Sequence, residues 1–234
     1  MSREGEEDDD IVCLDASFFV NDNYQLTTFK FGSHVLELLC LHSASTDFDL
    51  TGQLVWPGAM ILNDYLSKNS EMLQGFSAIE LGSGVGVTGI LCSKFCREVL
   101  MTDHNNEVLK ILKKNIELHA DCHAELAAEK LEWGNSDQVN EILQRYSGGF
   151  DLILGADICF QQSSVPLLFD TVEQLLRIRG TQCKFILAYV SRAKRMDSIV
   201  VNEAVQHGLL INEVTGTRSI VGNLEGFIFE VTLK

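Results

Sequence analysis

Near its start the chain has the pattern of hydrophobic and polar residues that is typical of a short β-hairpin. Hydrophobic and polar residues alternate over residues 24–31, which predicts a strand with one exposed face. Gly32 and Ser33 then supply a turn, and residues 34–42 can return as the paired strand. We therefore expect residues 11–51 to form a small β-rich extension.

From residue 52 onward, short apolar runs alternate with segments of helical spacing. A first helix is expected over residues 57–66, with a proline in its first turn. The runs with the length of buried parallel strands are 76–81, 98–102, 128–133, 150–156 and 183–190. Helical spacing fills the gaps, for example over 105–120 and 162–178. Strands alternating with helices of this length predict a parallel sheet covered by helices on both faces.

The C-terminal end breaks this alternation. Residues 209–214 and 224–233 are joined by a connection too short for a crossover helix, so we expect them to pair antiparallel. No internal repeat or low-complexity linker divides the chain. The pattern therefore predicts one α/β domain over residues 52–234, preceded by the β-rich extension.

Acidic residues outnumber basic ones, which limits the possible partners. The 234 residues include 18 Lys and Arg against 33 Asp and Glu, a net charge of −15. Nucleic-acid binding depends on clustered basic side chains, so we expect none. No apolar run approaches the roughly 20 residues that span a bilayer, and the start lacks the pattern of a secretory signal. We expect a soluble, monomeric cytoplasmic protein with no membrane partner, and a nuclear pool is compatible with the same features.

Part of the negative charge belongs to residues 1–10, which contain six acids and one arginine. Such a segment cannot bury enough apolar surface to offset the entropy lost on ordering, which predicts a disordered tail. The tail either keeps the protein soluble or docks a basic partner.

The seven cysteines are scattered, odd in number and without a Cys-x-x-Cys pair, which favours reduced thiols over a disulfide scaffold. His119, Cys122 and His123 resemble part of a metal site. A zinc site needs three or four ligands with a supporting shell, and no second half is visible. A polar helix end accounts for the same residues, so we predict no metal.

A glycine-rich segment follows the first apolar run. Residues 76–89 predict a strand that runs into a tight turn and a helix, and such a turn lies at the sheet edge where ligands bind. Gly84, Gly86 and Gly89 fit the spacing of a dinucleotide site, with Asp103 at the expected distance. Purely structural glycines remain an alternative explanation.

An acidic residue before the glycines separates two cofactor classes. Glu80 ends the strand two residues before Gly82. A carboxylate in this place repels a pyrophosphate but attracts an ammonium group. This favours an adenosyl amino acid such as S-adenosylmethionine over a nicotinamide cofactor.

Three further strands end in residues with chemical potential. Asp103 can accept hydrogen bonds from ribose hydroxyls or cap the next helix. Trp133 offers a flat face for an adenine ring, or it is a buried core residue. Asp157 follows an apolar strand beside the glycine turn, where a desolvated carboxylate is a functional candidate and a helix cap the alternative.

Together these residues resemble the S-adenosylmethionine-dependent methyltransferases of the seven-β-strand class, specifically methyltransferase family 16, which contains protein-lysine methyltransferases. The matching motifs, in chain order, are Val55-Trp56-Pro57, Glu80-Leu-Gly82-Ser-Gly84, Asp103, Leu131-Glu-Trp133-Gly134 and Gly155-Ala156-Asp157-Ile-Cys-Phe160. The resemblance implies a Rossmann-like sheet of seven strands in the order 3-2-1-4-5-7-6, with strand 7 antiparallel.

The resemblance also implies roles for single residues. The implied cofactor-binding residues are Trp56, Glu80, Gly82, Ser83, Gly84, Asp103, Trp133 and Ala156. Asp157 would hold the attacking amine, and the methyl group would move by in-line displacement, helped by orientation and desolvation. Phe160 stands where many members have tyrosine, so the amine would lack a hydroxyl partner.

The leading expectation is therefore a protein N-methyltransferase acting on lysine. A small-molecule N-methyltransferase on the same fold and a catalytically silent S-adenosylmethionine-binding module are the alternatives, and a nicotinamide dehydrogenase is a more distant one. Acidic surface charge would steer a cationic substrate toward the site. The basic residues Arg192, Lys194 and Arg195 either contact an acidic patch on a substrate or form an ordinary solvated face.

Overall fold

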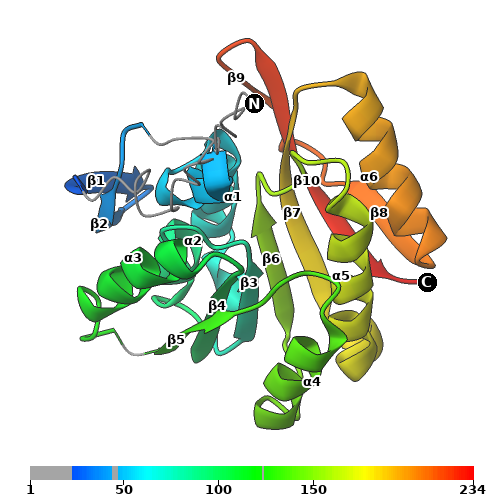
Figure 1. Ribbon diagram of the computed structural model, residues 1–234, viewed down its shortest axis with the longest axis horizontal. Helices are drawn as coiled ribbons and strands as arrows, with labels where there is room; N and C mark the ends of the chain where they lie inside the picture. Colours follow the sequence, from blue (N-terminus) through cyan, green and yellow to red (C-terminus); the bar gives the residue numbers. More distant parts are fainter. Residues whose placement is uncertain (1–22, 44–46, 123) are drawn as a thin grey trace, which may run out of the picture.

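The computed structural model describes residues 23–43, 47–122 and 124–234 (Figure 1). The acidic tail predicted over residues 1–10 lies outside these ranges. The elements before the glycine turn are β1 (Gln25–Phe31), β2 (His34–Cys40), η2 (Asp47–Gln53), α1 (Pro57–Lys68) and η3 (Ser70–Leu73). The elements of the first half of the main sheet are β3 (Ser77–Leu81), α2 (Val87–Cys92), β4 (Glu98–Asp103), α3 (Asn106–Glu117), β5 (Glu125–Lys130) and α4 (Ser136–Arg145). The remaining elements are β6 (Leu152–Ala156), α5 (Val165–Arg179), η4 (Gly180–Gln182), β7 (Lys184–Ser191), α6 (Lys194–Gln206), β8 (Leu209–Glu213), β9 (Ser219–Val221) and β10 (Leu224–Leu233).

The main sheet confirms the predicted fold class. Its strand order is β5-β4-β3-β6-β7-β10-β8, which is the order 3-2-1-4-5-7-6, and β9 pairs with β10 outside that path. The pairs among β3 to β7 are parallel, whereas β10 runs antiparallel to β7 and β8. The predicted C-terminal hairpin is thus present, with Leu209 opposite Leu233.

Two apolar layers hold helices against opposite faces of this sheet. In β3, Ala78 packs into the layer that contains α1, α2 and α3, whereas Ile79 packs into the layer that contains α4, α5 and α6. Figure 1 shows the three earlier helices on one side of the sheet and the three later helices on the other. Because successive strand side chains point to opposite faces, a doubly covered strand must be a continuous apolar run.

The predicted N-terminal hairpin forms a separate two-stranded sheet. Phe31 pairs with His34 across the turn, and Leu36 and Leu38 pack with Phe31 into the layer of α1 and α2. The 3₁₀ segment η2 spans the predicted boundary between residues 51 and 52, and that division into two parts stays a prediction.

The predicted strand over residues 128–133 is wrong in its position. The observed strand β5 occupies residues 125–130 and pairs with β4 from Glu98 opposite Glu125 to Asp103 opposite Lys130. As the edge strand it is half-exposed, so it tolerates polar residues that the apolar run did not include. Trp133 therefore lies three residues beyond the strand rather than at its end.

Two further features concern membranes and metals. No helix in residues 23–43, 47–122 and 124–234 combines the length and the apolar character needed to cross a bilayer. Within these same ranges, no three His, Cys, Asp or Glu side chains gather as a metal site. His119 Nδ1 lies 2.8 Å from the Asn115 carbonyl oxygen, and His123 falls outside the described residues.

Candidate active site

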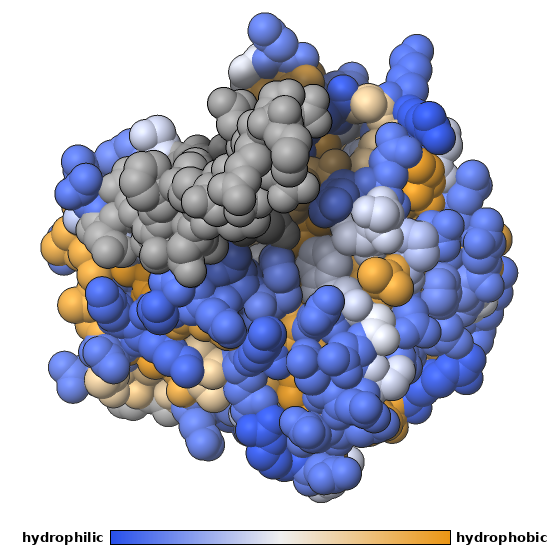
Figure 2. All heavy atoms as spheres, viewed as in Figure 1, coloured by the Kyte–Doolittle hydropathy of each residue, from blue (hydrophilic) through white to orange (hydrophobic). Residues whose placement is uncertain are grey.

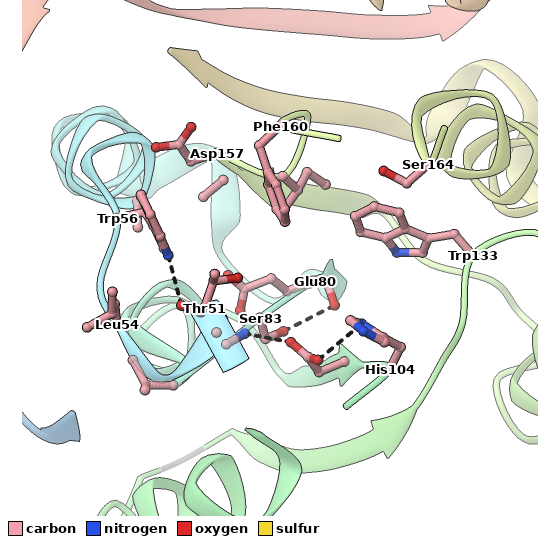
Figure 3. Close-up of a pocket in the computed structure, with 18 of the residues that line it drawn as sticks. Thr51, Leu54, Trp56, Glu80, Ser83, His104, Trp133, Asp157, Phe160 and Ser164 are labelled. Carbon is pink, nitrogen blue, oxygen red and sulfur yellow. Dashed lines mark hydrogen bonds and ion pairs between the residues drawn. The ribbon is translucent and has the colours of Figure 1, made fainter. Parts of the chain in front are cut away.

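A cavity of about 350 Å³ opens at the carboxyl ends of β3, β4 and β6 (Figure 3). Cavities that hold drug-sized ligands measure about 300–1,000 Å³. The indoles of Trp56 and Trp133 stand on opposite sides of this one. The structure brings all the predicted site residues to its wall: Trp56, Glu80, Gly82, Ser83, Gly84, Asp103, Trp133, Ala156, Asp157 and Phe160.

The glycine turn between β3 and α2 forms the floor of the cavity. Gly84 has a φ of +55°, a region that favours glycine, and its N–H donates to Asp103 Oδ2 at 3.1 Å. A Cβ atom on Gly84 would come within 2.7 Å of the Gly52 carbonyl oxygen. The glycine is thus a structural requirement of the turn, and it also clears the approach to the cavity.

Glu80 is the most deeply buried acid of the site. Burial raises the pKa of its carboxyl group to about 7, the Gly89 N–H that donates to Oε2 at 3.0 Å opposes the rise, and the charge of Asp103 adds to it. A carboxylate with so high a pKa lacks a compensating positive charge. A cationic group placed beside Glu80 would stabilise its charged form.

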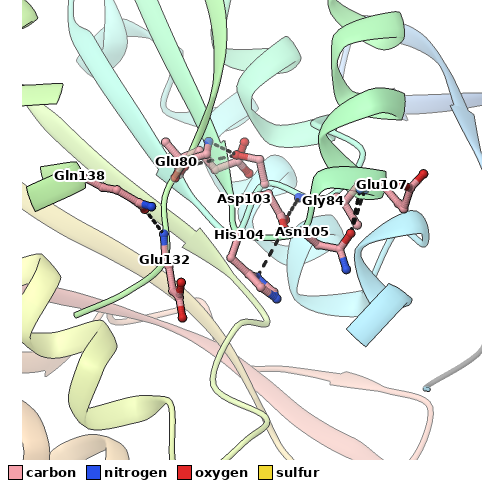
Figure 4. Close-up of polar contacts among 11 residues, drawn as sticks. Glu80, Gly84, Asp103, His104, Asn105, Glu107, Glu132 and Gln138 are labelled. Carbon is pink, nitrogen blue, oxygen red and sulfur yellow. Dashed lines mark hydrogen bonds and ion pairs between the residues drawn. The ribbon is translucent and has the colours of Figure 1, made fainter. Parts of the chain in front are cut away.

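Asp103 ends β4 and is held by two main-chain donors (Figure 4). Its Oδ2 accepts from Gly84 and its Oδ1 accepts from the Asn105 N–H at 3.0 Å. The cap of α3 is Asn105, whose Oδ1 accepts from the Glu107 N–H at 2.8 Å. The alternative that Asp103 caps this helix is therefore wrong, and the main chain orients its carboxylate at the cavity wall.

Trp133 lies between the core and the cavity, and its contact with an adenine ring stays a prediction. It is half-buried and packs against the layer of α4, α5 and α6, yet it also lines the cavity. A Cβ atom on Gly82 would lie 3.2 Å from Cζ2 of the indole, so the glycine turn makes room for the ring. The indole thus presents a flat face next to the glycine turn.

Asp157 has an environment that the sequence did not predict. Its side chain is 2% exposed, and its carboxylate is bonded by both terminal nitrogens of Arg192. Oδ2 also accepts the Gly58 N–H at 3.1 Å, so Asp157 caps α1 from 99 residues away. The helix-cap alternative is thus realised on a helix that precedes the aspartate. Its predicted role toward an amine stays a prediction.

The basic cluster after β7 is divided by this contact. Arg192 pairs with Asp157, which lines the cavity, although Arg192 itself does not; Lys194 and Arg195 are exposed and have no carboxylate within 4 Å among the described residues. The sequence left Arg192 either to contact an acidic patch on a substrate or to form a solvated face, and its pairing with Asp157 was not expected. The only sequence signal for a role of Arg192 near the cavity was its position directly after a central strand.

Other lining residues were also missed: Thr51, Leu54, Thr88, His104 and Leu167. Thr88 is notable because its buried Oγ1 makes no hydrogen bond of good geometry among the described atoms, although it lies near enough to the Glu80 carboxylate to lower the pKa of that group. Its place within the glycine-rich segment was a usable signal. Leu167 reaches the cavity from α5 and carried no signal in the local sequence.

Comparisons with known proteins agree with this geometry. A family model described as lysine methyltransferase matches residues 39–204. The chain is 34% identical over 163 residues to mouse protein N-lysine methyltransferase METTL21A, covering 68% of this chain and 66% of that protein. It is 32% identical over 147 residues to protein-lysine N-methyltransferase EFM3 of Chaetomium thermophilum, covering 61% of this chain but 43% of that protein. The matches thus span between 43% and 66% of the length of these relatives.

A solved structure supports the fold. The TehB-like SAM-dependent methyltransferase of Corynebacterium glutamicum matches with a TM-score of 0.53 at 16% identity, covering 80% of this chain and 92% of that one. The family model, by contrast, extends over well more than half of the sequence and contains every predicted site residue. This chain therefore belongs to the lysine methyltransferase family.

Proposed function

We propose that this chain is a protein N-methyltransferase that uses S-adenosylmethionine and acts on a lysine side chain. The observation that carries the proposal is the convergence of three buried carboxylates, a glycine turn and two indoles on one cavity in a member of this family. The relatives METTL21A and EFM3 carry the name of protein-lysine methyltransferases, and the same activity is proposed here.

The cavity offers the groups that S-adenosylmethionine requires. Glu80 would lie beside the cationic amino-acid part, because its carboxylate lacks a positive partner. Asp103 would accept ribose hydroxyls, and the Trp133 indole would cover the adenine ring. The buried Thr88 hydroxyl would gain a hydrogen bond of good geometry. The other proposed contacts come from Trp56, Gly82, Ser83, Gly84 and Ala156.

When bound, S-adenosylmethionine would supply a sulfonium methyl group. The lysine ammonium would first lose a proton to solvent, its lone pair would then form the new C–N bond, and the C–S electrons would stay on sulfur. The protein would contribute orientation and the exclusion of water. Phe160 is 51% exposed on the cavity wall, so its ring can contact the incoming side chain. Having no hydroxyl, it would position the amine by contact rather than by a hydrogen bond.

The charge of the protein supports a basic substrate. The net charge of −15 attracts a lysine-bearing segment at long range, and added salt should weaken this attraction. Methylation at an equal rate across a range of ionic strength would count against this part of the proposal.

A labelling experiment tests the proposed function. Purified protein is incubated with labelled S-adenosylmethionine and a cell lysate, and the modified residue is mapped by mass spectrometry. The wild type and a Gly148→Ala control should label a protein lysine, whereas Asp103→Ala should not. Label in small metabolites alone would indicate a small-molecule methyltransferase, and cofactor binding without any transfer would indicate a silent binding module. Loss of both binding and transfer in the wild type would reject the proposal.

We also propose that the protein works as a monomer in the cytoplasm, with access to the nucleus, and binds neither nucleic acid nor membranes. The six cysteines that the structure describes are free thiols, as a reducing compartment requires. Hydrophilic residues predominate on the coloured part of the face shown in Figure 2, with apolar residues in small groups among them. Light scattering of the purified protein and localisation of a tagged copy test these points.

A further inference from the structure

A forked ion pair lies beside the cavity: Asp157 belongs to its lining, and Arg192 holds Asp157 from outside the lining. Arg192 follows β7, and its Nη2 donates to Asp157 Oδ2 at 2.8 Å while Nη1 donates to Oδ1. Nη1 also donates to the Val190 carbonyl oxygen at 3.3 Å. The side chains are 33% and 2% exposed for Arg192 and Asp157 respectively. Such a two-pronged contact between a guanidinium and a shielded carboxylate is both strong and directional.

The same pair holds the segment before α1. Asp157 accepts the Gly58 N–H in the first turn of α1. The N-cap residue of this helix, Trp56, makes no capping hydrogen bond with its own side chain. Arg192 Cζ lies 5.7 Å from the centre of the Trp56 ring, whose Nε1 donates to the Thr51 carbonyl oxygen at 2.9 Å. Arg192 therefore ties together three segments around the cavity: the end of β6, the end of β7 and the entry to α1.

The backbone of Asp157 indicates that this arrangement is imposed by its surroundings. Its φ of +59° lies in the left-handed region that residues with a side chain rarely adopt. Its N–H donates to the Ala188 carbonyl oxygen at 2.9 Å, and a Cβ atom on Gly58 would fall 2.6 Å from Asp157 Cβ. A strained conformation persists where neighbouring contacts determine it, as they do here.

We propose that Arg192 and Asp157 form a fixed ionic clamp that shapes the mouth of the cavity, and that Asp157 serves methyl transfer as a positioning residue acting through Arg192. The proposal rests on the proposed function. The carboxylate already accepts three N–H groups, so a substrate amine would have to break the fork to reach it. The clamp would instead hold Trp56 and the turn leading to Phe160, two lining residues between which a lysine side chain would enter.

A double-mutant cycle tests the clamp. Asp157→Asn, Arg192→Met and the double variant are compared by calorimetry with S-adenosylmethionine and by methyl-transfer kinetics on the protein identified by labelling. Each single variant should weaken cofactor affinity about 3- to 10-fold and lower kcat about 10- to 100-fold, with KM for the protein within about 3-fold of wild type. The double variant should lose no more cofactor affinity or kcat than the more impaired of the two single variants, because the effects of residues that act as a unit are not additive.

The opposite pattern would overturn the proposal. If Asp157 itself received the amine, Asp157→Asn would raise KM for the protein substrate and lower the rate by the same factor with or without Arg192. If Arg192 merely blocked the site, Arg192→Met would raise the rate. Should the wild type label no protein, the proposed function fails, while the cycle in cofactor affinity still tests the clamp.

Two controls separate the clamp from general effects. Arg218 also bonds two carboxylates, those of Glu213 and Glu225, and lies 4.4 Å from the centre of the Phe227 ring, but none of its partners lines the cavity, whereas the Arg192 partners Asp157 and Trp56 do. Arg218→Met should leave affinity and kcat within about 2-fold of wild type, since exposed ion pairs contribute little. Arg192→Met alone leaves a buried charge unpaired, so the double variant should unfold at the higher temperature. If the double variant folds, the double-mutant cycle can be interpreted.

Discussion

The carbonyl oxygen of Gly52 lies so close to Gly84 that a Cβ atom on Gly84 would come within 2.7 Å of it. This contact seats η2, a segment before the first helix, on the glycine turn between β3 and α2. Both segments line the cavity. The fit of the glycine turn is thus determined partly by a residue more than thirty positions earlier.

Gly84→Ala should therefore damage both stability and ligand binding. The added methyl group meets a main-chain atom, and the φ of +55° strains alanine, so we expect a loss of about 2–4 kcal/mol in unfolding free energy. Cofactor affinity should fall by at least about 10-fold. Chemical denaturation and calorimetry measure the two effects. Gly148→Ala is the matched control, because nothing lies within 4 Å of its added Cβ atom. Equal behaviour of the two variants would contradict the packing argument.

Glu80 should make stability and binding depend on pH in opposite ways. Burial raises its pKa to about 7 in the folded protein, so the contribution of its protonated form to stability is complete below about pH 4.5 and is lost as the pH rises through 7. Glu80→Gln should remove this loss and stabilise the ligand-free protein at pH 8 by on the order of 3 kcal/mol. The wild type should bind S-adenosylmethionine more tightly as the pH rises through 7, and the variant should not. Parallel pH profiles of the two proteins would refute this role of Glu80.

Thr88→Val should weaken cofactor affinity about 3- to 10-fold. The Thr88 hydroxyl is buried at the cavity near the Glu80 carboxylate and makes no hydrogen bond of good geometry, so a polar ligand would supply one that valine cannot use. Ser77 provides the control, because its hydroxyl is also buried and unpartnered but it does not line the cavity. Ser77→Ala should leave affinity unchanged in the same titration. A matching loss in both variants would mean that the effect on affinity is not local.

Trp133 should report cofactor binding through its own fluorescence. The chain has two tryptophans, so Trp56→Phe leaves Trp133 as the sole indole. Adding S-adenosylmethionine should change its emission if the adenine ring lies on it. Trp133→Phe should keep affinity within about 3-fold, whereas Trp133→Ala should lower it by about 10-fold, because the flat contact is lost. An unchanged emission would place the adenine ring elsewhere.

The architecture and most of the site were predictable from local patterns. A strand covered on both faces must hide every side chain, so runs such as residues 152–156 are visible as uninterrupted apolar stretches. The residues around Glu80, Asp103 and Asp157 could be placed together because parallel strands end at one sheet edge. The position of strand β5 was predicted wrongly from the apolar run. An edge strand need not be apolar, and the register of this one is set by its partner β4.

What the sequence could not indicate is which groups meet across long separations. Arg192 looked like part of a solvated basic cluster, and Asp157 like an available carboxylate. They meet because β6 and β7 are neighbours in the sheet, with Ala156 opposite Ala188, which brings the residues after both strands to the same corner. Periodicity reports how a residue is buried within its own element, because burial repeats with the local backbone geometry. The partner of a charge depends on the placement of whole elements, and only the packed structure of this protein decides that.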